Sequence, residues 1–275
     1  MEGKTVLVTG ANVGIGLETA RGLAAMGARV LMAARDEAKG RAAAEDVRKS
    51  TGGDASMVLL DLARRASIEG AVEALGKERI DVLINNAGLI LSERSETAEG
   101  FETTFGVNHL GHFLLTLGLL DRLPDGARVV NVSSEAHRSS KGLDFEDLMR
   151  TRRKYASFPA YCDSKLANIL FTRGLVRRHP RLVAHSLHPG VVRTGFARDG
   201  DVKGPIKLLF GLIRPFMIPA RKGAETSIHV ASSTRGGETN GKYWQRSAIS
   251  DPTAAAQDDE AADRLWAISA ELWGL

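Results

Sequence analysis

Lys4-Thr5-Val6-Leu7-Val8-Thr9-Gly10-Ala11-Asn12-Val13-Gly14-Ile15-Gly16 is the stretch that decides the fold of this chain. Its first six residues form a β-prone apolar run, and the segment Leu17–Met26 after it has helical composition. A strand, a glycine turn and a helix in this order are the context of a dinucleotide-binding fingerprint. Gly10 can adopt backbone angles closed to other residues. Gly14 and Gly16 have no Cβ, so a phosphate and the first strand can approach closely.

The helix that follows these glycines begins with unpaired N–H groups and a partial positive charge, which suit a pyrophosphate. The glycine spacing is G-x-x-x-G-x-G rather than G-x-G-x-x-G. An ordinary tight turn between a strand and a helix is therefore the alternative interpretation.

Apolar runs alternate with helical patterns along the rest of the chain. Strands are expected at Val6–Thr9, Arg29–Ala33, Ser56–Leu60, Val82–Ile84, Arg128–Val132 and Val183–Leu187, and helices at residues 14–26, 37–50, 65–77, 99–122 and 159–179. Continuous apolar strands are typical of a parallel sheet that is buried on both faces. The alternation predicts right-handed crossovers and a Rossmann-type doubly wound α/β sheet with helices on both faces. We expect one domain over residues 1–275.

Tyr161 is the only one of the three tyrosines that has a lysine, Lys165, four residues later. Positions i and i+4 lie on one face of a helix. A nearby cation favours the ionised phenol and should lower the tyrosine pKa from its ordinary value of about 10. The pair therefore predicts a general acid/base, although such pairs also occur by chance on helix surfaces.

Composition narrows the class of protein. The chain has 275 residues, of which 43% are hydrophobic and 25% charged, as in an ordinary soluble globular domain. A net charge of +4 is too small to indicate nucleic-acid binding. The densest basic run, Arg150–Lys154, is expected to be a solvated loop. The seven histidines are scattered, so no metal site is predicted.

The single cysteine, Cys162, cannot form an intramolecular disulfide, and we expect it to pack rather than react. The first strand begins directly after Gly3, and no run of 18 apolar residues occurs, so neither a signal peptide nor a transmembrane segment is predicted. We expect a cytoplasmic protein.

The apolar segment Lys203–Ala220 predicts a mobile substrate lid at about residues 200–220. A membrane-surface helix and a core helix are the alternatives. The tail Pro252–Leu275 should end in a helix that packs on the body of the domain or near this lid.

Taken together, these motifs resemble the short-chain dehydrogenase/reductase family. The matching residues appear in the family's order and are Thr9–Gly16, Asn85-Asn86-Ala87-Gly88, Asn108, Asn131-Val132-Ser133-Ser134, Tyr161-x-x-x-Lys165 and His188-Pro189-Gly190. Within the family, Ala160–Asn168, Gly241–Trp244 and Arg264–Ser269 resemble the retinol dehydrogenase branch. That branch often carries an N-terminal membrane anchor, which is not seen here, so neither a membrane location nor a retinoid substrate is carried over.

The resemblance implies four catalytic residues. Ser134 would hydrogen-bond the substrate carbonyl oxygen, with Ser133 as the neighbouring candidate. Tyr161 would donate a proton to that oxygen or remove it. Lys165 would lower the Tyr161 pKa and hold the nicotinamide ribose, and Asn108 would anchor a water in a proton relay. The long insertion between Ser134 and Tyr161 is similar to one in the retinol dehydrogenase branch.

The resemblance also implies a dinucleotide site. Its residues would be Gly10, Asn12, Val13, Gly14, Ile15, Gly16, Arg35, Asp61, Leu62, Asn86, Ala87, Gly88, Tyr161, Lys165, Pro189, Gly190, Val192 and Thr194. Asp61 would meet the adenine edge and Thr194 the carboxamide. Ala34 stands where NAD enzymes carry an acid, and Arg35 can bind a 2′-phosphate, so NADP(H) is favoured over NAD. A one-residue shift would place Asp36 there and favour NAD, and Arg35 could be a plain surface cation.

The expected function is an NADP(H)-dependent oxidoreductase that acts on the carbonyl or alcohol group of an apolar substrate. Retinal-like molecules, aliphatic aldehydes, ketones and steroid-like molecules would all fit. The alternatives are a C=C reductase of the protochlorophyllide reductase type and an NADP-sensing regulator without turnover. Family members often form homodimers through helices equivalent to residues 99–122 and 159–179, but these apolar stripes could equally be buried within one subunit.

Overall fold

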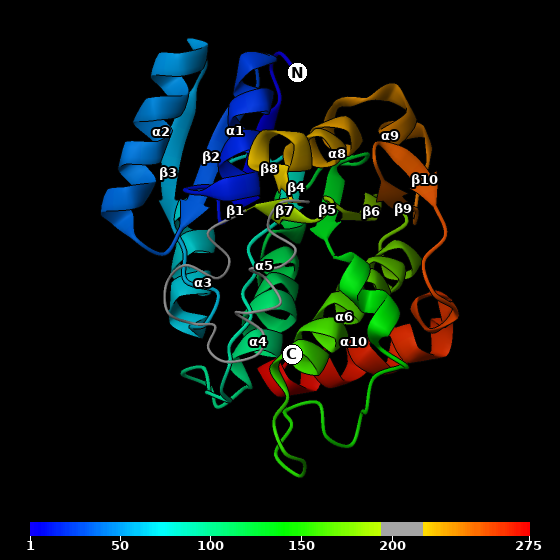
Figure 1. Ribbon diagram of the computed structural model, residues 1–275. Coiled ribbons are helices and arrows are strands. Elements are labelled where there is room, and N and C mark those ends of the chain that lie inside the picture. Colours follow the sequence, from blue (N-terminus) through cyan, green and yellow to red (C-terminus); the bar gives the residue numbers. More distant parts are fainter. Residues whose placement is uncertain (194–216) are drawn as a thin grey trace.

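The computed structural model describes residues 1–193 and 217–275. Eight strands form one sheet in the order β10-β9-β6-β5-β4-β1-β2-β3. All neighbours in it are parallel except β10, which pairs antiparallel with β9 (Figure 1). The strands are β1 (Thr5–Thr9), β2 (Arg29–Ala34), β3 (Ala55–Leu59), β4 (Val82–Asn85), β5 (Arg128–Val132), β6 (Val183–His188), β9 (Tyr243–Gln245) and β10 (Ala248–Ser250). The predicted parallel α/β sheet is confirmed.

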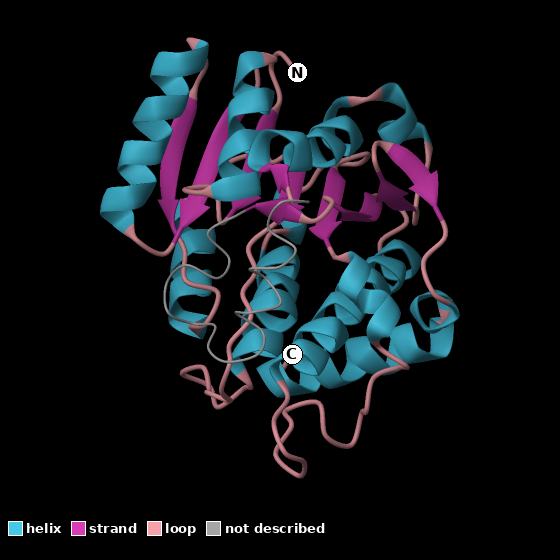
Figure 2. Cartoon of the chain, viewed as in Figure 1, coloured by secondary structure: helices cyan, strands magenta, loops and turns pink. Residues whose placement is uncertain are grey.

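Helices cover both faces of this sheet, as Figure 2 shows. One face carries α1 (Gly14–Ala25), α2 (Glu37–Thr51) and α8 (Ala220–Ser232), and the other carries α3 (Arg65–Ala74), α5 (Gly111–Gly118), α6 (Ser157–Arg178) and α10 (Asp259–Trp273). In β1, Val6 and Val8 enter the core under the first group while Leu7 enters the core under the second. Because both faces of the central strands are buried, β1, β2 and β4 read as nearly continuous apolar runs rather than alternating ones.

The predicted helix at residues 99–122 is interrupted in the structure. Glu102 pairs with Glu96 in an isolated bridge and then caps the short α4 (Thr103–Phe105), so the helix begins later than expected. A π-helical turn (Gly106–Leu110) follows before α5 begins. A π turn inside a helix often marks a functional site, and this one contains Asn108.

Several elements were not predicted from sequence. They include α8, the short α9 (Thr234–Glu238), the edge strands β9 and β10, and a separate parallel pair made of β7 (Val192–Arg193) and β8 (Ile218–Pro219). The predicted lid at about 200–220 lies mostly outside the described residues. The four unpredicted strands, β7 to β10, are only two or three residues long, which is too short to show a hydrophobic periodicity in the sequence.

Helix α10 covers the apolar faces of α5 and α6 that family resemblance had offered as a dimer interface. Trp266 of α10 packs edge-on against Phe113 and beside Phe171, with ring centroids 5.0 and 5.8 Å apart. Trp273 donates its indole N–H to the carbonyl of Leu110 at 2.9 Å. These contacts bury part of the apolar stripes of α5 and α6 within one subunit, and the possible homodimer stays a prediction.

Candidate active site

The glycine turn after β1 is tightly packed at its glycine positions. Gly10 and Gly14 have φ values of +64° and +61°. A Cβ on Gly16 would lie 2.3 Å from the carbonyl oxygen of Gly10 and 2.6 Å from Asn86 Nδ2. Helix α1 starts at Gly14, and its N-cap, Val13, supplies no side-chain hydrogen bond. The turn thus presents backbone N–H groups beside a close-packed strand, which fits the pyrophosphate of a dinucleotide.

The loop after β4 is locked to the end of β1. Thr9 Oγ1 accepts hydrogen bonds from the backbone N–H groups of Asn86 and Ala87, both at 2.9 Å. In return, Asn86 Nδ2 donates to the carbonyl of Thr9 at 2.7 Å. These bonds hold Asn86 and Ala87, two predicted cofactor residues, against the glycine turn.

At the end of β2, Arg35 is exposed and Asp36 is engaged elsewhere. Asp36 Oδ1 accepts from the backbone N–H of Lys39 at 2.9 Å, as the N-cap of α2. This hydrogen bond is the largest contribution to a pKa of Asp36 below its ordinary value. The carboxylate that would have favoured NAD is therefore used to begin a helix. Arg35 is exposed and has no ion pair with any residue of 1–193 or 217–275.

Asp61 and Leu62, predicted near the adenine, follow β3. Asp61 Oδ1 accepts from the N–H of Ala63 at 3.0 Å. Leu62 is buried, and its carbonyl oxygen would lie 2.5 Å from a Cβ on Gly111. Both residues shape the turn at the carboxyl end of the sheet, where ligands of such folds bind.

The structure brings Ser134, Tyr161 and Lys165 together from two elements. Ser134 follows β5 and Tyr161 lies in the second turn of α6, and the Ser134 side chain is close enough to the phenol to favour its ionised form. Lys165 Nζ lies 5.6 Å from the centroid of the Tyr161 ring. Ser133, the neighbouring candidate, instead donates its hydroxyl to the carbonyl of Lys165 at 2.6 Å. Ser134 is therefore the serine that faces the phenol.

The pKa of Tyr161 is not lowered in this structure, contrary to the expectation from the Tyr161–Lys165 pair. Burial raises the pKa of Tyr161 to about 12, and the hydrogen bond from Ser134 opposes that rise only in part. Burial also lowers the pKa of Lys165 to about 8. Desolvation thus dominates the pKa of both groups, and it keeps the phenol protonated at neutral pH.

Lys165 is held in a narrow space. It is 3% exposed, and its Nζ donates to the carbonyl of Val132 at 3.1 Å. A Cβ on Gly88 would lie 3.2 Å from Lys165 Nζ and 3.3 Å from Asn108 Oδ1. Gly88 is a predicted cofactor residue. Because it has no side chain, Lys165 and Asn108 can pack closely against the loop after β4.

The side chain of Asn108 braces the site through three hydrogen bonds. Its Oδ1 accepts from the N–H of Leu89 at 2.8 Å, and its Nδ2 donates to the Leu89 carbonyl at 2.9 Å and to Ser164 Oγ at 3.0 Å. Ser164 in turn donates to the carbonyl of Tyr161 at 2.8 Å. Asn108 thus joins the loop after β4 to the turn of α6 that carries Tyr161. This connection was not predicted from the sequence.

The insertion between Ser134 and Tyr161 is fastened to α6 by a buried charge pair. Arg150 forms an ion pair with Asp163, which also accepts from Ser140 Oγ at 2.6 Å. Arg150 is 5% exposed and has a left-handed φ of +52°. The prediction that Arg150–Lys154 is wholly solvated is therefore wrong for Arg150, because Asp163 offsets the cost of burying its charge.

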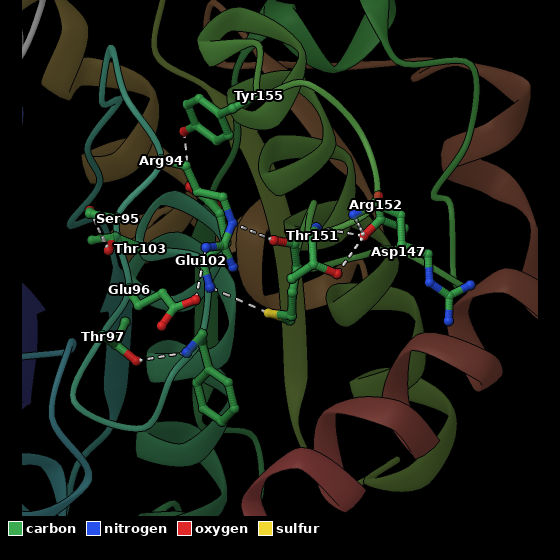
Figure 3. Close-up of polar contacts among 12 residues, drawn as sticks. Arg94, Ser95, Glu96, Thr97, Glu102, Thr103, Asp147, Thr151, Arg152 and Tyr155 are labelled. Atoms are coloured by element: carbon green, nitrogen blue, oxygen red, sulfur yellow. Dashed lines mark hydrogen bonds and ion pairs between the residues drawn. The ribbon is translucent and has the colours of Figure 1, made fainter.

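A second set of contacts joins the insertion to the segment before α4 (Figure 3). Tyr155 donates its hydroxyl to the buried carboxylate of Glu102 at 2.9 Å, and Arg94 Nε donates to the carbonyl of Met149 at 3.1 Å. Asp147 accepts from the backbone N–H groups of Thr151 and Arg152. These hydrogen bonds consequently hold the insertion beside α6 and against the segment that precedes α4.

The segment after β6 lies near the glycine turn that follows β1. Gly190 has a φ of +96°, and a Cβ there would lie 2.7 Å from Ile218 Cδ1. Val192 Cγ2 would lie 2.5 Å from a Cβ on Gly223, a position that also faces Ile15. Val192 is therefore near the glycine turn, and its predicted role in cofactor binding stays a prediction. Thr194, predicted to bind the carboxamide, lies outside the described residues.

Sequence reasoning assigned no role to several polar residues at the site. His188 Nδ1 accepts from the N–H of Glu135 at 3.1 Å, which ties the end of β6 to the turn that begins at Ser134. Thr9 and His112 were also missed. The sequence signal that could have drawn attention to His112 was its spacing. It follows Asn108 by four residues, so both side chains are expected on the same face of a helix.

Other groups at the site are not reactive or metal-binding in this structure. Cys162 is buried, and burial raises the pKa of its thiol to about 12, which agrees with a packing role. Among residues 1–193 and 217–275, no three His, Cys, Asp or Glu side chains gather as a metal site would require. None of the helices described is long and apolar enough to cross a bilayer.

Comparison with known proteins agrees with this geometry. The family model of short chain dehydrogenases matches residues 4–144. Human retinol dehydrogenase 12 is 45% identical over 282 aligned residues, which cover 100% of this chain and 88% of the relative. A solved structure from Mycobacterium paratuberculosis has a TM-score of 0.81 at 37% identity, covering 98% of this chain and 93% of its own. The Pseudomonas aeruginosa RhlG/NADP active-site complex has a TM-score of 0.70 at 26% identity, covering 88% and 94%.

The chain belongs to the short-chain dehydrogenase family of oxidoreductases, which use a nicotinamide cofactor. Within that family it is similar to the retinol dehydrogenases. The resemblance drawn from its motifs is thereby confirmed at both levels.

Proposed function

We propose that this protein is an NADP(H)-dependent carbonyl reductase or alcohol dehydrogenase for an apolar substrate, with Tyr161 as the general acid/base. The observation that carries the proposal is the placement of the Ser134 hydroxyl where it favours the ionised form of Tyr161, beside the buried Lys165. These three groups lie at the carboxyl edge of the sheet, next to a glycine turn that fits a dinucleotide. A phenol, a hydroxyl and a cation at one point suit proton transfer to a carbonyl oxygen.

The residues would divide the reaction as follows. A bound nicotinamide dinucleotide would supply or accept the hydride. Ser134 would hold the substrate oxygen by a hydrogen bond. Tyr161, which is protonated at neutral pH, would donate its proton to that oxygen in reduction and recover it in oxidation. The ammonium of Lys165 would stabilise the phenolate that remains after the proton has left, since an opposite charge nearby favours the ionised form.

The preference for NADP(H) over NAD(H) is supported by the end of β2. Arg35 is exposed there, and Asp36 is committed to the N-cap of α2. A guanidinium can make paired, charge-assisted hydrogen bonds to a 2′-phosphate. The solved Pseudomonas aeruginosa RhlG structure is a complex with NADP, and this similarity supports the same choice for this chain.

Arg35→Ala is expected to weaken NADPH binding by about tenfold to a hundredfold, the loss of one charged hydrogen-bonding partner of roughly 1.5–3 kcal/mol. NADH lacks the 2′-phosphate, so its affinity should change little. Fluorescence titration of both dinucleotides would measure this difference. Lys39→Ala, which removes a neighbouring exposed cation, serves as the control. Equal losses for NADPH and NADH would show that Arg35 does not recognise the phosphate.

The rate of carbonyl reduction should fall as the pH rises above about 8. Burial lowers the pKa of Lys165 to about 8, so the lysine is charged below this pH and neutral above it. The neutral amine cannot stabilise the phenolate of Tyr161, and log kcat should then decrease by about one for each pH unit. Lys165→Arg keeps a charge over this range and should shift the fall to higher pH. A wild-type rate that is constant from pH 7 to 10 would exclude the role of the ammonium.

The decisive experiment is a substrate panel. Purified protein would be assayed for oxidation of NADPH and NADH with retinal, aliphatic aldehydes and ketones, with Tyr161→Phe as the blank. Turnover that prefers NADPH and is lost in the blank is the expected result. Tight binding of NADPH without turnover of any carbonyl would overturn the proposal, and a panel of C=C substrates would follow.

A further inference from the structure

A buried histidine, His112, joins the cofactor loop to the π-helical turn. The residue is 2% exposed. Its Nε2 lies 2.9 Å from Thr9 Oγ1, at the end of β1, and its Nδ1 lies 3.1 Å from the carbonyl oxygen of Asn108. Each ring nitrogen therefore has one partner, and the two partners belong to different parts of the site.

The hydrogen bonds around Thr9 determine which ring nitrogen carries the proton. A hydroxyl has one donor and two acceptor lone pairs. The N–H groups of Asn86 and Ala87 occupy both lone pairs of Thr9 Oγ1. The Thr9 proton must then be donated, and His112 Nε2 at 2.9 Å is nearer than the carbonyl of Ile84 at 3.4 Å. Nε2 is thus the acceptor, and Nδ1 carries the hydrogen that is donated to Asn108.

The connection continues on both sides of the ring. On one side, Thr9 holds the backbone of Asn86 and Ala87 against the glycine turn. On the other, Asn108 holds Leu89 and Ser164, and Ser164 donates to the carbonyl of Tyr161. A series of hydrogen bonds therefore runs from the loop after β4 to the turn of α6 that carries Tyr161, and it passes through the backbone and the side chain of Asn108. The side chains in this series, Thr9, His112, Asn108 and Ser164, are all buried.

We propose that His112, as the neutral Nδ1–H tautomer, is a positioning residue that fixes the Asn108 carbonyl and the cofactor loop relative to each other. It touches neither substrate nor reacting atoms, and it acts through Thr9 and Asn108. Its effect on turnover rests on the proposed function. Its tautomer and its effect on the cofactor loop do not.

The charges that face His112 agree with a neutral ring. The pKa of His112 is lowered to about 4, mainly by burial and in smaller part by the nearby cation of Lys165, while the hydrogen bond to the Asn108 carbonyl opposes the decrease. His109, one turn away on the same segment, also faces it, and burial lowers the pKa of His109 to about 3. The ring should consequently stay uncharged around neutral pH.

Nitrogen NMR of the wild-type protein labelled at histidine, without cofactor, tests the tautomer directly. Long-range ¹H–¹⁵N spectra distinguish the two ring nitrogens, and His112→Gln assigns the signal. We expect a neutral ring with hydrogen on Nδ1 from pH 6 to 8. An Nε2–H ring, or one that becomes charged in this range, would overturn the proposal whether or not the protein reduces carbonyls.

Two substitutions test the positioning role. Glutamine keeps one acceptor and one donor, whereas leucine keeps neither. His112→Leu should weaken NADPH binding several-fold and lower kcat by about tenfold to a hundredfold, the scale expected for a misplacement of up to about 1 Å. His112→Gln should recover most of both losses. Equal behaviour of the two variants would overturn the role, and if His112→Leu does not fold, the tautomer and the NADPH affinity of His112→Gln decide.

His109→Leu is the matched control, because His109 is an equally buried histidine whose Nε2 bonds Ser269 of α10. It should leave NADPH affinity unchanged. A loss equal to that of His112→Leu would indicate a general packing effect and contradict the proposal. If the wild-type protein turns over no carbonyl, the proposed function fails, while the NMR and affinity measurements still decide the role of His112.

Discussion

Tyr161→Phe is expected to lower kcat by about a hundredfold to ten-thousandfold, the range that general acid–base catalysis contributes. The substitution removes one oxygen and leaves the ring on α6. That oxygen is the group whose ionised form the Ser134 side chain favours. NADPH affinity should change little, because the glycine turn and the loop after β4 stay intact. Single-turnover kinetics and a fluorescence titration would separate the two effects.

Tyr243→Phe provides the matched control for this experiment. Tyr243 is also buried, and its hydroxyl has no hydrogen-bond partner among residues 1–193 and 217–275. Removing that hydroxyl should leave kcat unchanged and should not lower the free energy of unfolding, since an unpaired buried polar group is costly. If Tyr161→Phe retained near wild-type turnover, Tyr161 could not be the acid.

Gly16→Ala is expected to abolish tight dinucleotide binding and to destabilise the fold. The new Cβ would lie 2.3 Å from the Gly10 carbonyl oxygen and 2.6 Å from Asn86 Nδ2. Backbone cannot rotate away as a flexible side chain can, so the glycine turn must shift. Overpacking of this kind costs about 1–3 kcal/mol of unfolding free energy. Binding of NADPH should weaken by at least about tenfold, which corresponds to 1.4 kcal/mol.

Gly70→Ala, in the middle of α3, is the control for Gly16→Ala. No atom lies within 4 Å of a Cβ built at Gly70, and its φ is not positive. Alanine there should stabilise the helix by about 0.5–1 kcal/mol without affecting NADPH. Urea unfolding and NADPH titration of both variants would make the comparison. A Gly16→Ala protein that binds NADPH normally would contradict the assignment of the turn.

Sequence was a good guide wherever a local pattern reported on a local cause. The strand and glycine turn at Thr5–Gly16 and the Tyr161–Lys165 pair depend on spacing within a few residues, and the structure places both as expected. The six predicted strands were also found, because parallel strands buried on both faces are continuous apolar runs.

The remaining features depend on partners far away in sequence. The pKa of Tyr161 is set by burial under the whole domain, which an i,i+4 pattern cannot report. Arg150 belongs to a basic run, yet it is buried by a charge pair with Asp163. The role of His112 follows from Thr9, which lies 103 residues earlier. A pattern within one helix does not report the burial of Tyr161, the pairing of Arg150 with Asp163 or the contact of His112 with Thr9.

The packing of α10 on α5 and α6 has a consequence for how the chain is made. Helix α10 (Asp259–Trp273) comes after every strand of the sheet in chain order. While a ribosome is still translating the segment between α6 and α10, Phe113 and Phe171 lack the indole of Trp266 that covers them. The nascent chain therefore carries uncovered aromatic surface throughout that interval, the condition in which chaperones are needed and aggregation competes with folding.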